Sequence, residues 1–220
     1  MFKRFVLISI VAAAFTACTD DSVNIEDLKA IGGARYGGTF RFMSSEKIET
    51  LLPLQATTIY TQRITSQIFD PILRLDASGS KVIPSVAESF SVSPDGKSYT
   101  LHIRKGVYFH PDECLDGDER ELIAEDVKFT LDMSCSGLKI NDVSFMLIDR
   151  VVGAAAFHDA TKTQLKAGGV SGIKVLDRYK IRIDLVEAFA GFDKLLTYSG
   201  FGVFPKEAYE FYHDDIKKHP

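Results

Sequence analysis

Two short runs of this sequence contain residue types that catalytic motifs use. Gly96-Lys97-Ser98 matches the end of a phosphate-binding loop, where a lysine and a hydroxyl group contact phosphate and magnesium. That loop also needs a glycine five positions before Gly96, and Ser91 occupies that position. The run from Gly169 to Gly172 lacks the Gly-x-Ser-x-Gly spacing of a nucleophile elbow. Both runs are better interpreted as turns, and we expect neither a catalytic residue nor an enzyme.

An acidic run from Pro111 to Glu121 offers carboxylates for a metal, since hard cations such as calcium take several oxygen ligands. The spacing of the acidic residues does not match the Asp-x-Asp-x-Asp-Gly calcium loop, so a solvated acidic turn is the preferred interpretation. The histidines form no His-x-x-x-His pair. We therefore expect no metal and no cofactor. The residues considered are Asp112, Asp116, Asp118 and Glu121, with His102, His110, His158, His213 and His219.

The middle of the chain has the pattern of a hairpin followed by a helix. Phe90–Val92 is rich in apolar residues and ends at Ser93–Gly96, where proline and glycine favour a tight reversal. Apolar residues then alternate with polar ones over Tyr99–Ile103, the period of a strand with one buried face. From Ala124 to Ser134 the apolar spacing is helical, with acidic residues in the first turn. Pattern alone would fit any generic α/β hairpin unit.

The composition is that of a globular chain. It is 45% hydrophobic and 25% charged, with a net charge of −4. This mild acidity offers no basic patch for nucleic acid, so nucleic acid is excluded as a partner. Beyond the first residues, no apolar run is long enough to cross a membrane.

The N-terminus has the features of an export signal. Lys3 and Arg4 precede an apolar stretch, Phe5–Phe15, that is too short to span a bilayer but suits a signal-peptide core. Thr16-Ala17-Cys18 then resembles the lipobox of bacterial lipoproteins, although Phe15 stands where leucine is usual. The resemblance implies a signal peptide at residues 1–17 and an acylated Cys18 inserted in membrane lipid. An ordinary signal peptide cleaved nearby is the alternative.

The segment after Cys18 is predicted to be an acidic flexible tether over residues 18–35. It has no clear apolar period and ends near two adjacent glycines, Gly32 and Gly33, so nothing in it predicts a packed element. Its acidic residues are Asp20, Asp21, Glu26 and Asp27.

Specific runs of residues resemble the family 5 solute-binding proteins, extracytoplasmic receptors that deliver peptides and some other solutes to ABC importers. The run from Ile83 to Thr130, with its Ser93–Gly96 turn, is similar to the N-terminal signature of that family. Four further segments are similar to its opening strand, its first helix leading into a strand, a later hairpin, and the segment that follows. These are Gly37–Phe42, Ser66–Asp76, Gly172–Leu185 and Val203–Ala208.

The resemblance implies an α/β fold of the type II periplasmic-binding-protein kind, with two lobes and an extra β-rich domain. Family members are much longer, so only the N-terminal part of lobe one and the extra domain are expected here. We expect residues 36–68 to open lobe one, residues 69–205 to form the extra α/β domain, and residues 206–220 to return toward lobe one, cut short.

The resemblance also implies a function. The chain would be the substrate-binding lipoprotein of an ABC importer, a periplasmic, lipid-anchored monomer that captures oligo- or dipeptides by hinge closure. It would pass them to permease subunits whose ATPase lies in the cytoplasm. The alternatives are a ligand-sensing or chaperone-like lipoprotein of the same fold, a binder of nickel, haem or sugar, and a nonfunctional truncated fragment.

Ligand contacts can be placed from the resemblance at a few positions. Family members bind peptides just after the opening strand, which corresponds here to Thr57, Thr58 and Ile59. An aromatic residue after the Ala124–Ser134 helix forms a second contact, and Phe145 is the nearest candidate. The alternative is that Ile59 and Phe145 are core residues.

The cysteines suggest one further bond. With Cys18 assigned to lipid, Cys114 and Cys135 remain as an even pair in an oxidising compartment. We predict that they form a disulfide that fixes the acidic insertion to the following helix. Two free buried thiols are the alternative.

Overall fold

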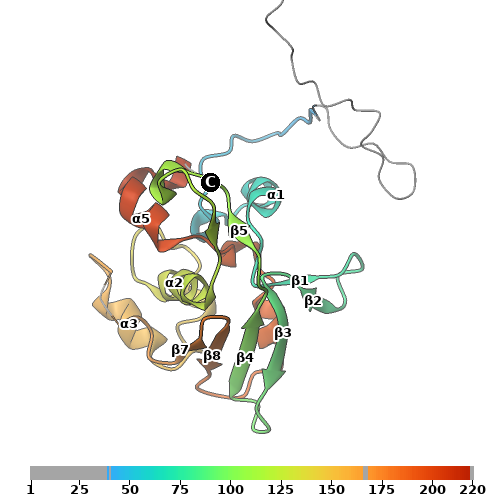
Figure 1. Ribbon diagram of the computed structural model, residues 1–220, viewed down its shortest axis with the longest axis vertical. Helices are drawn as coiled ribbons and strands as arrows, with labels where there is room; N and C mark the ends of the chain where they lie inside the picture. Colours follow the sequence, from blue (N-terminus) through green and yellow to red (C-terminus); the bar gives the residue numbers. More distant parts are fainter. Residues whose placement is uncertain (1–38, 40, 166–167, 219–220) are drawn as a thin grey trace, which may run out of the picture. The chain divides into compact units, whose positions relative to one another are not determined.

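The computed structural model describes residues 39, 41–165 and 168–218 (Figure 1). The chain divides into two units, residues 1–43 and 44–220, and every helix and strand described here belongs to the second. The signal peptide predicted at residues 1–17, Cys18 and the tether predicted at residues 18–35 lie outside the described residues. So does half of the predicted opening strand Gly37–Phe42, whose described residues, Thr39, Arg41 and Phe42, lie in no strand.

A four-stranded antiparallel sheet forms from two hairpins. β3 (Ala87–Val92) pairs with β4 (Ser98–Ile103), and β7 (Ile173–Asp177) pairs with β8 (Lys180–Asp184). The order is β3-β4-β8-β7, so the two hairpins meet where β4 pairs with β8 (Figure 1). Both predicted hairpins are confirmed. The turn between β3 and β4 closes as the sequence predicts, with Gly96 at a φ of 70°, a conformation that glycine adopts without strain.

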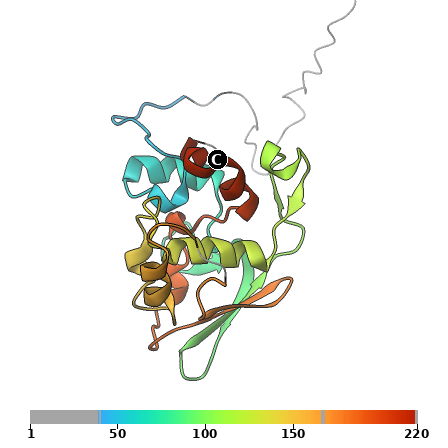
Figure 2. The ribbon, with the colours of Figure 1, turned by 90° about the vertical axis from the view of Figure 1, so that its left-hand side faces the viewer.

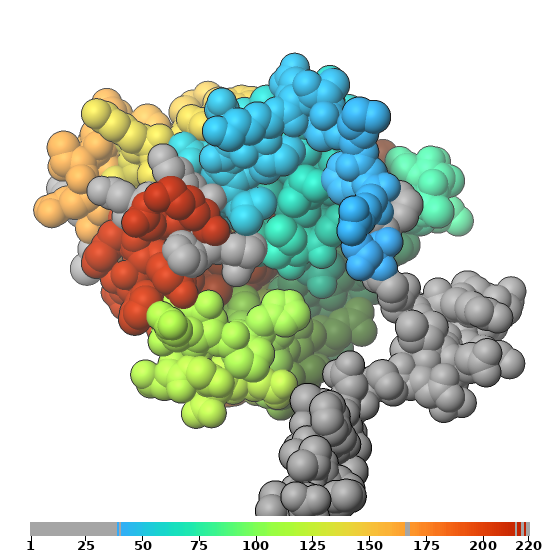
Figure 3. Space-filling view, turned by 90° about the horizontal axis from the view of Figure 1, so that it is seen from above, coloured from blue at the N-terminus to red at the C-terminus, as the bar shows by residue number. Residues whose placement is uncertain are grey.

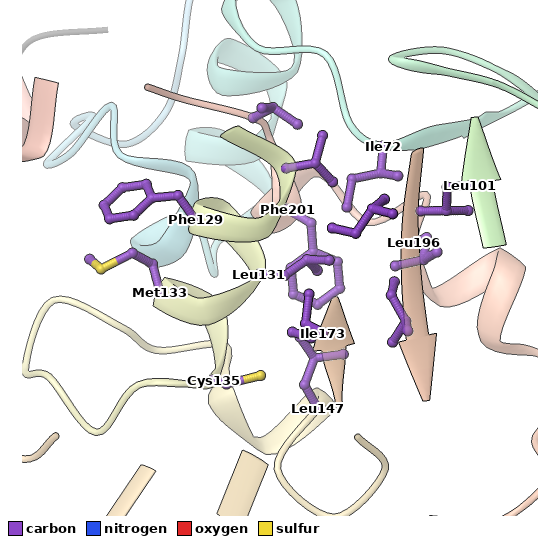
Figure 4. Close-up of a cluster of buried hydrophobic side chains, with 14 of the residues drawn as sticks. Ile72, Leu101, Phe129, Leu131, Met133, Cys135, Leu147, Ile173, Leu196 and Phe201 are labelled. Atoms are coloured by element: carbon purple, nitrogen blue, oxygen red, sulfur yellow. The ribbon is translucent and has the colours of Figure 1, made fainter. Parts of the chain in front are cut away.

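Helix α2 (Ala124–Cys135) lies against one face of this sheet and confirms the predicted helix (Figures 1 and 2). The two inner strands, β4 and β8, alternate buried and half-buried residues, as the period of two predicts. Figure 4 shows side chains from the helix, the strands and the following loops meeting in one apolar core. Leu101, Leu131, Leu147, Ile173, Leu196 and Phe201 are among the residues that this core buries almost completely.

The remaining elements surround this unit. β1 (Leu73–Leu75) and β2 (Val82–Pro84) form a two-stranded ribbon, and β5 (Tyr108–Phe109) and β6 (Arg120–Glu121) form another. The other helices are η2 (Pro53–Gln55), α1 (Ile59–Ile68), η3 (Glu113–Leu115), η4 (Ser144–Met146), α3 (Ala154–Ala160), α4 (Phe192–Leu195), η5 (Ser199–Phe201), α5 (Lys206–Tyr212) and η6 (His213–Lys218).

The acidic insertion, residues 111–121, is fixed to α2 and α5 by charged groups. Arg120 donates to the buried Asp126 of α2 at 2.6 and 3.0 Å, and to Glu207 of α5 at 3.0 Å. The same Asp126 carboxylate accepts from the Ile123 N–H at 2.8 Å and so caps the first turn of α2. A single arginine therefore joins the insertion, the start of α2 and α5, which lies 87 residues further along the chain.

The base of the insertion is fixed to the β7–β8 hairpin by Glu121. Its carboxylate accepts from the Gly106 N–H at 3.0 Å, from Arg178 at 3.1 Å and from the Tyr179 hydroxyl at 2.9 Å. These three donors lower the pKa of Glu121, because each favours the ionised carboxylate. The Gly106 N–H has the largest effect, and Arg178 and Tyr179 come next.

The predicted disulfide is wrong for this structure, in which Cys114 and Cys135 are free thiols. Cys114 lies in η3, within the insertion, and that insertion meets α2 at its first turn through Asp126. Cys135 is the last residue of α2, which places it about 14 Å further along the helix axis at 1.5 Å per residue. A disulfide needs Cα atoms closer than about 7 Å.

Candidate functional site

The turn between η2 and α1 presents the first group of predicted ligand contacts. Pro53 begins η2, and Thr58 caps α1 by accepting the Thr61 N–H at 3.3 Å. Leu54 and Ala56, on the inner side of the turn, are fully buried. Thr57, Thr58 and Ile59 are consequently held at the surface.

This turn also leaves backbone groups unpaired. The Thr57 N–H donates to the Gln55 carbonyl, and the Thr58 carbonyl accepts from Gln62, both at 2.9 Å. Within the described part of the chain, the Thr57 carbonyl and the Thr58 N–H have no partner. An extended peptide forms its main-chain hydrogen bonds with groups of this kind.

The loop after α2 lies beside this turn. The Asp142 N–H donates to the Leu54 carbonyl at 2.9 Å, which joins the two segments directly. The buried Asn141 fixes the loop from within, since its amide donates to the Ser134 and Ser136 carbonyls at 3.0 and 2.7 Å. Phe145, in η4, stands out from this loop. Figure 3 shows the surfaces of the two segments, in blue and yellow, side by side.

Tyr198 supports the η2–α1 turn from a third part of the chain. Its hydroxyl accepts from Gln62 at 3.2 Å and donates to the Ala56 carbonyl at 3.4 Å. Gly200 leaves room for it: a Cβ there would lie 2.3 Å from the Tyr198 ring and 3.1 Å from Val143. Burial raises the pKa of Tyr198, although the bond from Gln62 opposes the rise, so its hydroxyl remains a donor at neutral pH.

We call the surface formed by Thr57, Thr58, Ile59, Asp142 and Phe145 the exposed wall. Ile59 is 59% exposed and Phe145 is 62% exposed, so the alternative that they are core residues is wrong. Their contact with a ligand stays a prediction. Asp142, Gln62 and Tyr198 were not predicted, because their place in the site comes from contacts between distant segments.

Two hollows lie elsewhere in the second unit. The first, of about 370 Å³, lies between the insertion and the α5–η6 region and is lined mainly by apolar residues such as Leu52, Phe69, Leu122 and Phe204. The second, of about 450 Å³, contains the ion pairs Arg120–Asp126 and Lys128–Asp132. Four of the charged groups of this second hollow are thus already paired with one another.

Three polar groups of the first hollow, on Asp112, Cys114 and Tyr212, are bonded to one another. Asp112 accepts from the Tyr212 hydroxyl at 2.7 Å and from the Cys114 N–H at 2.9 Å. Burial, and then the hydrogen bond to Asp112, raises the pKa of Cys114 to about 12. The bond to Asp112, and then burial, raises the pKa of Tyr212 to about 12. This cluster holds the insertion against α5, and its thiol is a poor nucleophile.

The described residues contain neither a metal centre nor a membrane-spanning helix. Among residues 39, 41–165 and 168–218, no group of three or more His, Cys, Asp or Glu side chains is arranged to hold a metal ion. No helix in that part of the chain has both the length and the apolar character needed to span a bilayer.

A family model described as "Bacterial extracellular solute-binding proteins, family 5 Middle" matches residues 81–220. The chain belongs to this family, which confirms the resemblance seen in the sequence. Its members bind solutes and are not enzymes.

Two relatives that are similar in sequence are named as peptide-binding proteins. Di/tripeptide-binding protein 1 of Pseudomonas aeruginosa is 45% identical over 65 residues, which cover 30% of this chain and 12% of that protein. Oligopeptide-binding protein AmiA of Streptococcus pneumoniae is 32% identical over 154 residues, covering 70% of this chain and 22% of AmiA. The chain thus spans a minor part of the length of these relatives.

Solved structures confirm the fold class. Haemophilus influenzae OppA in complex with the peptide RPPGFSPFR has a TM-score of 0.64 and 20% identity, covering 76% of this chain and 31% of OppA. DppA from Helicobacter pylori, in complex with the peptide STSA, is described as a periplasmic binding protein. It has a TM-score of 0.59 and 23% identity, and the match covers 77% of this chain and 31% of DppA. The chain has the mixed α/β fold of about a third of such a receptor.

Proposed function

We propose that this chain is the front portion of a receptor that captures peptides outside the cytoplasmic membrane for an ABC importer. The observation that carries the proposal is the exposed wall, in which Ile59 and Phe145 are more than half exposed and two backbone groups lack partners among the described residues, at positions to which the resemblance assigns peptide contacts. An extended peptide would pair with the Thr57 carbonyl and the Thr58 N–H, and its side chains would rest against Ile59 and Phe145.

The rest of the receptor would supply the opposite side of the cleft. In this proposal residues 36–68 and 206–220 belong to lobe one and residues 69–205 form the extra domain, while a second lobe closes over the ligand. The closed form would dock on the permease, and ATP hydrolysis in the cytoplasm would drive release. The receptor itself would be periplasmic and held to the membrane through acylated Cys18.

Thermal unfolding of the full-length receptor with short peptides tests this function. A ligand that binds only the folded state stabilises that state by mass action, by about 2.7 kcal/mol at a hundred times its Kd, and so raises the melting temperature. We expect di- to tetrapeptides to stabilise the receptor and sugars, nickel and haem to leave it unchanged. Stabilisation by one of those three alone, with none by peptides, would assign the wall to that solute instead.

A pair of matched variants links the binding to the wall. Phe145→Ala removes an exposed aromatic ring from the wall, and Phe211→Ala removes an equally exposed ring from α5, where the residue is 54% exposed. We expect Phe145→Ala to weaken peptide binding and Phe211→Ala to leave it unchanged. Equal effects of the two substitutions would remove the wall from the proposal.

A further inference from the structure

We infer that η6 is a latch, a segment that can leave its seat beside the first hollow by turning at His213. Three observations carry the inference. The backbone at His213 is strained, α5 is fixed on one side of this residue, and the seat of η6 on the other side is loosely packed. The latch goes beyond the proposed function, and only its link to movement of the lobes rests on that function.

The strain lies in the backbone of His213, the first residue of η6, which has a φ of 45° and a ψ of −117°. This combination lies outside the regions that residues with a side chain normally occupy. It is close to the first central position of a type II′ turn, where glycine is usual. The side chain of His213 is exposed, so its burial does not account for the conformation. A strained backbone of this kind persists only where the surrounding structure imposes it.

On one side of His213, α5 is fixed to the insertion (Figure 1). The Tyr212 hydroxyl donates to the Asp112 carboxylate at 2.7 Å, and near the start of the helix Glu207 accepts from Arg120 at 3.0 Å. Because these bonds hold α5 near both of its ends, the helix cannot shift to relieve the strain at His213.

On the other side, Ile216 seats η6 beside the first hollow. Ile216 is 3% exposed, and it lines the hollow of about 370 Å³ together with residues such as Leu115 and Ala208. A side chain beside unfilled space makes fewer contacts than one in a close-packed core. The strain at His213 therefore opposes a burial that is itself weak, which narrows the free-energy gap between a seated and a released η6.

Release would turn the chain at His213 and expose Ile216, while α5 stays bound to the insertion. In the proposed receptor, residues 206–220 lead back to lobe one, so this turn would change the direction in which the chain enters that lobe. Hinges are commonly a few residues at the ends of elements that absorb large changes of φ and ψ. The pivot would thus lie at His213, within the return segment, and not at the domain boundary near Pro205.

Hydrogen exchange of the full-length receptor tests the latch, because the exchange of a peptide covering residues 213–218 measures how often η6 opens. His213→Gly accepts the positive φ without strain, so it should stabilise the seated state and slow this exchange about fivefold. His213→Ala is the matched control, since it removes the imidazole and keeps the strain, and it should leave the rate unchanged. Ile216→Ala weakens the seat and should accelerate the exchange at least tenfold.

The peptide that covers α3 is the reference, and its exchange should stay constant in all three variants. The inference is overturned if His213→Gly fails to slow the exchange of η6, if His213→Ala slows it equally, or if Ile216→Ala leaves it unchanged. Equal changes in α3 and η6 would also overturn it, because the substitution would then act on the whole domain. None of these results needs a ligand, so the latch and the proposed function can fail separately.

The link to the lobes has its own measurement. The tetrapeptide that raises the melting temperature of the receptor most should change the exchange of η6 in the wild type at least twofold. An unchanged rate, with the same peptide still raising the melting temperature, would remove the link to lobe movement and leave peptide capture intact.

Discussion

Replacing Asp126 with asparagine should destabilise the protein through the charged clip that holds the insertion. Asp126 is 5% exposed, and its two carboxylate oxygens bind Arg120 at 2.6 and 3.0 Å. Asparagine keeps the size of the side chain and an oxygen that can still accept from the Ile123 N–H. The substitution therefore removes mainly the charge that faces Arg120.

The expected loss lies between two known limits. Breaking a fully buried ion pair costs about 3–5 kcal/mol because a buried charge loses its partner, whereas exposed pairs contribute about 0–1 kcal/mol. The Arg120 side chain is 26% exposed and keeps Glu207 at 3.0 Å, so its charge is not left without a partner. We expect a loss of about 2 kcal/mol, which corresponds to about 4–8 °C in melting temperature for a domain of this size.

Urea unfolding followed by circular dichroism measures this loss. Glu210→Gln is the control, since Glu210 forms a pair with Lys206 at 2.6 Å in which both side chains are more than half exposed. We expect this control to change the free energy of unfolding by less than about 0.5 kcal/mol. The reasoning about the clip is refuted if Asp126→Asn lies within about 0.5 kcal/mol of the wild type, or if the control loses as much.

Three other predictions concern the wall, the insertion and the thiols. Gly200→Ala should displace the Tyr198 ring, lowering stability by about 1–3 kcal/mol and weakening peptide binding; an unchanged melting temperature would contradict the steric argument. The lowered pKa of Glu121 contributes stability that is present above its ordinary value of 4.5 and is lost as the pH falls through the folded-state pKa. Glu121→Gln should therefore lose less stability than the wild type on acidification, as unfolding curves measured across that range would show. Alkylation of the denatured, unreduced protein, followed by peptide mapping, should modify both Cys114 and Cys135. Two unmodified cysteines, in peptides whose joint mass is lower by two hydrogens, would show instead that the disulfide forms.

Local patterns in the sequence were enough to predict the β3–β4 hairpin and the main helix, whereas the β7–β8 hairpin was predicted from the resemblance. The turn at Ser93–Gly96 and the alternation after it depend on neighbouring residues alone, and so does the acidic first turn of α2. The sheet order could not be predicted in this way. It depends on β4 pairing with β8, whose partners Ser98 and Asp184 are 86 residues apart.

The candidate site was predictable only in part, for the same reason. Thr57, Thr58, Ile59 and Phe145 were found from a resemblance, and their exposure agrees with a ligand surface. Tyr198 supports the wall across 136 and 142 residues of sequence, a relation that no short pattern encodes. The disulfide failed because the number of cysteines and their compartment say nothing about the distance between them.

The meeting of the two hairpins at β4 and β8 also bears on how the protein is made. The inner edge of β4 stays open until β8 has been synthesised, because Ser98 and its partner Asp184 are 86 residues apart. At roughly 5–20 residues per second this delay is about 4–17 s, far longer than the microseconds in which the β3–β4 hairpin can form. During that interval a nascent chain would carry a strand edge that other strands can join. Any cellular factor that shields the emerging polypeptide would act on β4 before the rest of the sheet exists.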